Sequence, residues 1–158
     1  MSPEQVLVDS FMLADAAHVF EGKLYVYGGG WNFLTIREPN VPRPITIVGR
    51  IIIPWLETAQ ELMITIFLEH REEGTVLERD RIFRIGMHSQ ARPDQPESLE
   101  TATPFSLDIP GVVFLYPGEY AFVMDYNDKE LARTRFQVNF AYDEAPAQPA
   151  TAAAPGDL

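Results

Sequence analysis

The sequence contains no cysteine. This absence excludes disulfide bonds, thiolate metal sites and catalysis by a thiol. Disulfides are typical of secreted domains of this kind, so their absence favours a cytoplasmic location, which we take as an expectation.

The chain also lacks any long apolar stretch. A membrane-spanning helix needs about 20 consecutive apolar residues, and the longest candidate, 45–54, is far shorter and contains Arg50. The first twenty residues carry no Lys or Arg before their apolar run, and Asp9 and Asp15 interrupt that run. They therefore do not resemble a signal peptide, and we expect no membrane association.

Basic residues are few. The chain has 12 Lys and Arg against 23 Asp and Glu, which gives a formal net charge of −11. An acidic surface repels the phosphate backbone of nucleic acids. Nucleic acid is therefore not a predicted partner.

The pattern of histidines and acids predicts no metal and no other cofactor. No two of His18, His70 and His88 lie within four residues of each other, so the spacings of a paired histidine metal site are missing. His70 falls in the charged stretch 69–73, which is predicted to be the solvated end of a hairpin. The segment 125–130 lacks the glycine that a calcium-binding loop needs at its sixth position. It is interpreted as a tight hairpin turn at 127–128.

Apolar residues alternate with polar ones along most of the chain, and Gly, Pro and Asn-Asp turn signals separate the alternating runs. The pattern predicts an all-β domain over 1–140, an immunoglobulin-like antiparallel β-sandwich of about nine strands. A partly open barrel has the same sequence signals and remains an alternative. The expected strands are 6–17, 23–28, 31–36, 45–53, 61–69, 75–85, 104–109, 112–116 with 119–126, and 130–140.

Two segments do not fit the strand pattern. Residues 87–103 are polar and contain two prolines, so they are predicted to form a long loop. Residues 141–158 contain many Ala and Pro without an apolar period. They cannot bury enough surface to offset the entropy of ordering, and a disordered tail is predicted.

An unusual glycine and aromatic segment supplies the candidate binding residues. Three consecutive glycines could cradle an anion with their amides, but a bend or bulge between strands is the preferred interpretation. Nearby aromatic side chains could form an exposed platform for a sugar or a protein, or could pack in the core. The residues concerned are Tyr25, Tyr27, Gly28, Gly29, Gly30, Trp31 and Trp55.

Ser10, Asp15 and His18 are the residue types of a hydrolase triad. In one unbroken strand Asp15 and His18 point to opposite faces, and Ser10 and His18 lie roughly 26 Å apart at about 3.3 Å per residue. The strand pattern therefore argues against a shared catalytic site.

The segment 13–31, LADAAHVFEGKLYVYGGGW, resembles the start of an uncharacterised bacterial family of short β-rich proteins. The similarity continues through Ile53-Pro54-Trp55 with Glu57-Thr58 and the closing PGEY hairpin, over roughly 8–138. The resemblance implies a small sandwich domain of unknown function and carries over no functional residue.

These observations leave the biological function unknown and three hypotheses open. A non-enzymatic protein-interaction or self-assembly module comes first, because no catalytic constellation is visible and sandwich edges invite strand pairing. A small-ligand or carbohydrate-binding sandwich that uses Trp31 and Trp55 is the alternative. A hydrolase with Asp15 and His18 comes third.

Overall fold

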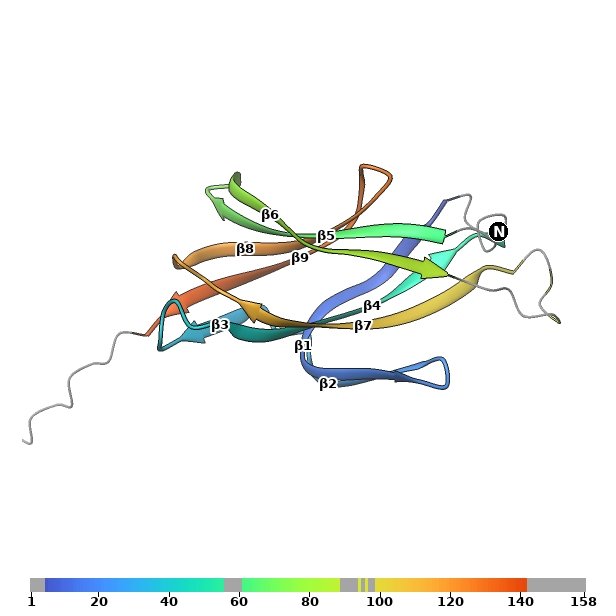
Figure 1. Cartoon of the computed structure of the whole chain (residues 1–158), viewed down its shortest axis with the longest axis horizontal. Coiled ribbons are helices and arrows are strands. Elements are labelled where there is room, and N and C mark those ends of the chain that lie inside the picture. Colours follow the sequence, from blue (N-terminus) through green and yellow to red (C-terminus); the bar gives the residue numbers. More distant parts are fainter. Residues whose placement is uncertain (1–4, 56–60, 89–93, 95, 97–98, 142–158) are drawn as a thin grey trace, which may run out of the picture.

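The computed structural model describes residues 5–55, 61–88, 94, 96 and 99–141. The nine strands of this part form two sheets (Figure 1), one with the order β2-β1-β4-β7 and one with the order β3-β9-β8-β5-β6. The strands are β1 (Leu7–Phe20), β2 (Lys23–Gly29), β3 (Phe33–Ile36), β4 (Arg43–Ile53), β5 (Glu61–Glu72), β6 (Thr75–His88), β7 (Thr101–Val112), β8 (Gly118–Tyr126) and β9 (Lys129–Phe140).

The hydrophobic core lies between the two sheets, which face each other in Figure 1. Strand β5 illustrates the local cause: Leu62, Ile64 and Ile66 are buried, whereas the residues between them face outward. Because side chains alternate along a strand, this sequence pattern gives each sheet one apolar inner face. The predicted immunoglobulin-like sandwich of nine strands is therefore confirmed.

One pair of strands is parallel. Strand β3 pairs with β9 from Phe33 opposite Gln137 to Ile36 opposite Phe140, and the amide of Ala141 donates a hydrogen bond to the Ile36 carbonyl at 2.8 Å. All the other strand pairs are antiparallel. The short β3 thus closes one side of the five-stranded sheet with the last strand of the chain.

The prediction that 112–116 forms a strand continuous with 119–126 is wrong. Strand β7 ends at Val112, and 113–117 crosses from the four-stranded to the five-stranded sheet, where β8 begins. Phe114 is buried in the core and anchors this crossover. The predicted long loop is also shorter than expected, because β6 extends to His88 and β7 starts at Thr101. The predicted disordered tail lies outside the described residues from 142 onward.

Tyr120, near the start of β8, ties the crossover to the sheet. Its hydroxyl donates a hydrogen bond to the Tyr116 carbonyl at 2.7 Å, and its ring packs edge-on against Phe114. A buried tyrosine that bonds back to the backbone a few residues upstream is the tyrosine corner of immunoglobulin-like sandwiches. Burial also raises the pKa of the Tyr120 hydroxyl.

We expect Tyr120→Phe to lower the free energy of unfolding by about 1–2 kcal/mol, because the ring stays packed while the Tyr116 carbonyl loses its donor. Urea unfolding followed by circular dichroism measures this change. Tyr116→Phe is the matched control: its side chain is exposed, and its carbonyl remains. Equal stability of the two variants would contradict a structural role for the corner.

Candidate interaction surface

Strands β1 and β2 form a hairpin that extends beyond the rest of the four-stranded sheet. The pairing of β1 with β4 ends at Ala14 opposite Thr46, whereas the pairing of β1 with β2 runs from Ala14 to Phe20. Figure 1 shows this hairpin on the side of the sheet away from the five-stranded sheet. The tip is a two-residue turn, Glu21-Gly22, with positive φ at both residues, which is the geometry that matches the twist of paired strands.

One face of the hairpin is aromatic. The ring of His18 stacks on Tyr25 at 5.0 Å and on Tyr27 at 6.0 Å between centroids. Phe20 lies on the same face, since it shares the parity of His18 along β1. Tyr27 and Phe20 are 57% and 59% exposed. Two of the predicted binding residues, Tyr25 and Tyr27, therefore lie side by side on an open surface.

The three glycines end β2 and turn the chain toward β3. Gly28 and Gly30 have positive φ, and the side chain of Asp15 lies so close to Gly28 that a methyl group there would collide with the carboxylate. The amide of Gly30 donates to the Leu13 carbonyl at 2.8 Å. These contacts fit the interpretation of the glycines as a bend.

The two tryptophans do not join the tyrosines. Trp31 is half-buried, packs against the core and meets Phe136 edge-on at 6.1 Å. Trp55 follows β4, whose end pairs with the start of β1, whereas Tyr25 pairs with His18 near the end of β1. Trp55 is therefore near the opposite end of the β1–β4 pairing from the hairpin that carries the tyrosines. The structure thus brings together only Tyr25 and Tyr27 of the four predicted aromatic residues.

Asp15 and His18 lie on opposite faces of the hairpin. The carboxylate of Asp15 lies against Gly28, while His18 stacks on the tyrosines of the other face. Ser10 lies in the part of β1 that pairs with β4. The register contains no shift between Ala14 and Phe20 that could rotate either side chain, so the three residues do not share a site.

Strand β2 is the least protected of the four strands at sheet edges. Proteins protect edges from pairing with other chains by charges, prolines or short strands. Strand β7 carries Pro104 and Pro110, β6 carries five charged residues between Glu78 and Arg84, and β3 has only four residues. Strand β2 carries one charge, Lys23, beside four apolar or aromatic residues.

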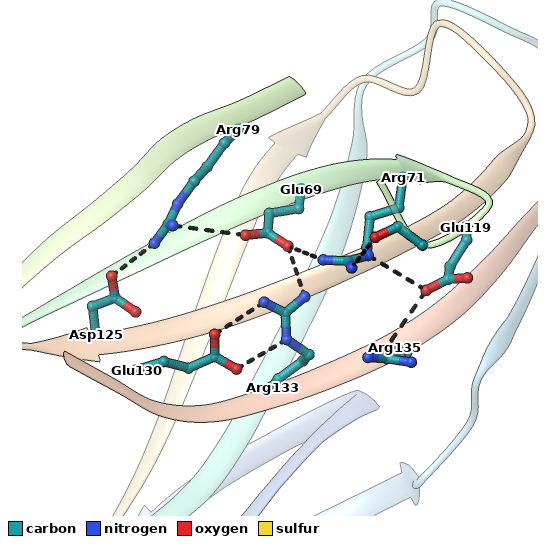
Figure 2. Close-up of polar contacts among 9 residues, drawn as sticks. Glu69, Arg71, Arg79, Glu119, Asp125, Glu130, Arg133 and Arg135 are labelled. Atoms are coloured by element: carbon teal, nitrogen blue, oxygen red, sulfur yellow. Dashed lines mark hydrogen bonds and ion pairs between the residues drawn. The ribbon is translucent and has the colours of Figure 1, made fainter. Parts of the chain in front are cut away.

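A second notable surface covers the outer face of the five-stranded sheet, where arginines surround Glu69 (Figure 2). The Glu69 carboxylate, only 2% exposed, accepts hydrogen bonds from Arg133 at 2.7 Å and from Arg71 at 3.0 Å. Arg79 approaches its other oxygen at 3.8 Å. Asp125, Glu130, Glu119 and Arg135 extend this network of ion pairs.

Burial of Glu69 raises the pKa of its carboxyl, but the hydrogen bonds from Arg133 and Arg71 outweigh burial and hold the pKa below its ordinary value. A hydrogen bond from Arg133 likewise lowers the pKa of Glu130. The Glu69 and Glu130 carboxylates are therefore charged at neutral pH.

The sequence-based prediction of a solvated hairpin end at 69–73 is wrong for Glu69 and for His70. Strand β5 runs on to Glu72, and the ring of His70 stacks on Tyr120 at 4.6 Å. The sequence signal for a partner of Glu69 was the pair of arginines at alternate positions of β9, Arg133 and Arg135. The strand order, which the sequence does not reveal, places β9 within reach of Glu69 on β5.

No group of three or more His, Cys, Asp or Glu side chains in the described residues is arranged to hold a metal ion. The described part of the chain contains no helix that is long and apolar enough to cross a membrane.

The fold and the exposed hairpin define a small immunoglobulin-like sandwich with one unprotected edge. The chain belongs to a family of unknown function, DUF6941, whose model matches residues 9–139. No curated protein matches the sequence.

Solved structures match this chain at low sequence identity. An immunoglobulin-like protein of Pseudomonas aeruginosa is 10% identical with a TM-score of 0.43, and the match covers 85% of this chain and 97% of that one. A β-glucosidase from intestinal bacteria is 10% identical with a TM-score of 0.48, and the match covers 85% of this chain and 16% of that one. An alkylpurine DNA glycosylase of Pseudomonas fluorescens is 11% identical with a TM-score of 0.44, with 84% and 30% covered. The chain thus spans less than a third of the glucosidase and of the glycosylase.

Proposed function

We propose that the protein is a non-enzymatic self-assembly module, in which β2 of one copy pairs with β2 of a second copy. The observation that carries this proposal is the exposed hairpin, an edge strand without protection beside an aromatic face. Antiparallel pairing of two β2 edges about a two-fold axis would join two four-stranded sheets and bury the same patch on both copies.

The low net charge of the hairpin favours a second copy of the chain as the partner that pairs with β2. Two chains of net charge −11 repel each other over most of their surfaces. Between Asp15 and Gly29 the only charged residues are Asp15, Glu21 and Lys23, which sum to −1. The hairpin is therefore a surface on which two copies can approach with little repulsion.

The apolar area of the hairpin suits a modest affinity. Phe20, Tyr25 and Tyr27 are 59%, 41% and 57% exposed, so each leaves on the order of 100 Å² open to solvent. Val19 and Val26 add apolar surface on the opposite face of the hairpin. Covering both faces on two copies would bury roughly 800–1,000 Å² in total, near the lower limit for specific interfaces. A reversible dimer is the expected state.

A charge placed in the β2 edge tests the proposal. We expect the wild-type protein to shift from monomer to dimer in sedimentation velocity runs between roughly 1 μM and 1 mM, a range that suits interfaces of this size. Val26→Lys should shift the midpoint at least tenfold upward, because a lysine in an edge strand opposes pairing. Val76→Lys is the matched control, since Val76 on β6 is about as exposed as Val26.

A wild-type protein that stays monomeric over the whole range would overturn the proposal. So would a dimer that Val26→Lys and Val76→Lys affect equally. Because Val26 and Val76 are both exposed, thermal unfolding should show that both variants keep the fold.

A further inference from the structure

The outer face of the five-stranded sheet contains a depression next to the arginine network. Its volume is about 570 Å³, within the usual range for small-molecule sites. It extends from β5 and β6 to the β8–β9 turn, and Asp125, at its border, is the residue that binds Arg79 in Figure 2. The lining residues are Met63, Thr65, Phe67, Arg81, Arg84, Asp125, Asn127 and Asp128.

A β-bulge places two arginines on this face. The register between β5 and β6 shifts between Ile66, opposite Phe83, and Phe67, opposite Arg81. The extra residue lets Ile82 and Phe83 both pack against the core, and the arginines on either side of them both line the depression. Bulges commonly redirect side chains in this way next to functional sites.

Arg81 and Arg84 differ from the other arginines of the face. Arg71, Arg79, Arg133 and Arg135 each have a carboxylate within 4.0 Å. In the described part of the chain, no carboxylate pairs with Arg81 or Arg84. Two free guanidinium groups at one opening provide the donors that a carboxylate or a phosphate accepts.

The opposite wall supplies acceptors. Asn127 and Asp128 form the predicted hairpin turn with positive φ, and their side chains line the opening. Asp125 accepts a hydrogen bond from Arg79 with one oxygen, while its other oxygen is buried and has no hydrogen-bond partner. The exposed Asn127 and Asp128 oxygens are the acceptors that hydroxyl groups of a ligand would reach.

We infer that this depression binds a small anionic sugar, one that carries a carboxylate or a phosphate together with several hydroxyl groups. Arg81 and Arg84 bind the anionic group, and Asn127 and Asp128 accept hydrogen bonds from the hydroxyls. Met63 contacts the apolar side of the sugar ring, whereas the Phe67 ring is already covered by the Arg79 guanidinium, 4.0 Å from the ring centroid. The net charge of −11 repels a polyanion, so the site selects a ligand with one anionic group.

This inference is independent of dimer formation through β2, because the depression belongs to the other sheet. Binding is therefore measured on the full-length protein and on the Val26→Lys variant alike.

The probes are glucuronate, glucose 6-phosphate and, as the neutral control, glucose. Each is added to the ¹⁵N-labelled full-length protein, and amide shifts are followed at the lining residues. We expect saturable shifts with at least one of the anionic sugars and binding at least tenfold weaker with glucose. The Arg81→Gln/Arg84→Gln double variant should weaken anionic sugar binding at least tenfold.

Arg37→Gln is the control for loss of a positive charge elsewhere on the protein, because Arg37 is exposed in the segment between β3 and β4, away from the depression. It should leave binding unchanged. Both anionic sugars binding would support the shared anion chemistry, and one alone would identify carboxylate or phosphate as the preferred group. Binding of neither, or binding that the double variant retains, would overturn the inference. Arg81 and Arg84 make no ion pair in the described structure, so the double variant should keep the wild-type melting temperature.

Discussion

Replacing Glu69 with glutamine should lower the free energy of unfolding by about 2–3 kcal/mol at pH 7. The change removes the negative charge that faces Arg71, Arg79 and Arg133. Loss of one partner of a buried ion pair commonly costs about 3–5 kcal/mol. The expected value is smaller here because the arginine side chains are 13–40% exposed and water can screen them.

Thermal and urea unfolding measure this effect, and at about 2–4 °C per kcal/mol the melting temperature should fall by roughly 5–10 °C. Glu119→Gln is the matched control. Its carboxylate is on the same face but is 38% exposed, with arginines at 3.7 and 4.0 Å. We expect at most about 1 kcal/mol for that variant.

The loss of stability caused by Glu69→Gln should become smaller as the pH falls. The folded-state pKa of Glu69 is lowered from 4.5, so its contribution to stability is complete above that value and is lost as the pH falls through the folded-state pKa. The difference between wild type and Glu69→Gln should therefore be constant from pH 7 to about 5 and shrink toward pH 3. A difference that stays the same at pH 3 would contradict the ionic role of Glu69.

Replacing Gly49 with alanine should destabilise the fold by about 2–4 kcal/mol. Gly49 lies in the middle of β4, opposite Phe11 of β1 and Phe105 of β7. A methyl group there would collide with the Ser10 carbonyl oxygen and lie 2.8 Å from the Phe105 ring. Since the carbonyl belongs to the backbone of a paired strand, the clash requires the sheet itself to move.

Urea unfolding of Gly49→Ala beside Gly111→Ala tests this expectation. Gly111 is also in a strand, and a methyl group there would meet only Pro42, at an ordinary 3.6 Å. We expect Gly111→Ala to change stability by less than about 1 kcal/mol. Similar losses in the two variants would show that close packing at Gly49 is not the cause.

Most strands could be predicted because their signals are local. The alternation of Leu62, Ile64 and Ile66 and the turn at 127–128 depend only on neighbours in the sequence, and the structure has both as expected. The error at 112–116 has a tertiary cause. An apolar run can be a strand or a crossover held by one buried residue such as Phe114, and only the position of β7 and β8 in different sheets distinguishes the two.

The candidate surfaces were predictable to different degrees. Tyr25 and Tyr27 could be assigned to one face from their spacing of two residues. The separation of Trp55 from the tyrosines could not be predicted, because it follows from the register of β1 with both β2 and β4. The arginine network was missed for the same reason, since Glu69 and Arg133 are 64 residues apart in the chain.

The sequence by itself determined the all-β class, the hairpin turn at 127–128 and the acidic, cysteine-free composition, because side-chain alternation and turn chemistry act over a few residues. Only the tertiary structure decided the strand order, the exposure of the β2 edge and the burial of Glu69. It also decided the placement of Arg81 and Arg84 beside Asp128. Each of these features depends on contacts between strands that lie far apart in the chain, and local patterns do not specify those contacts.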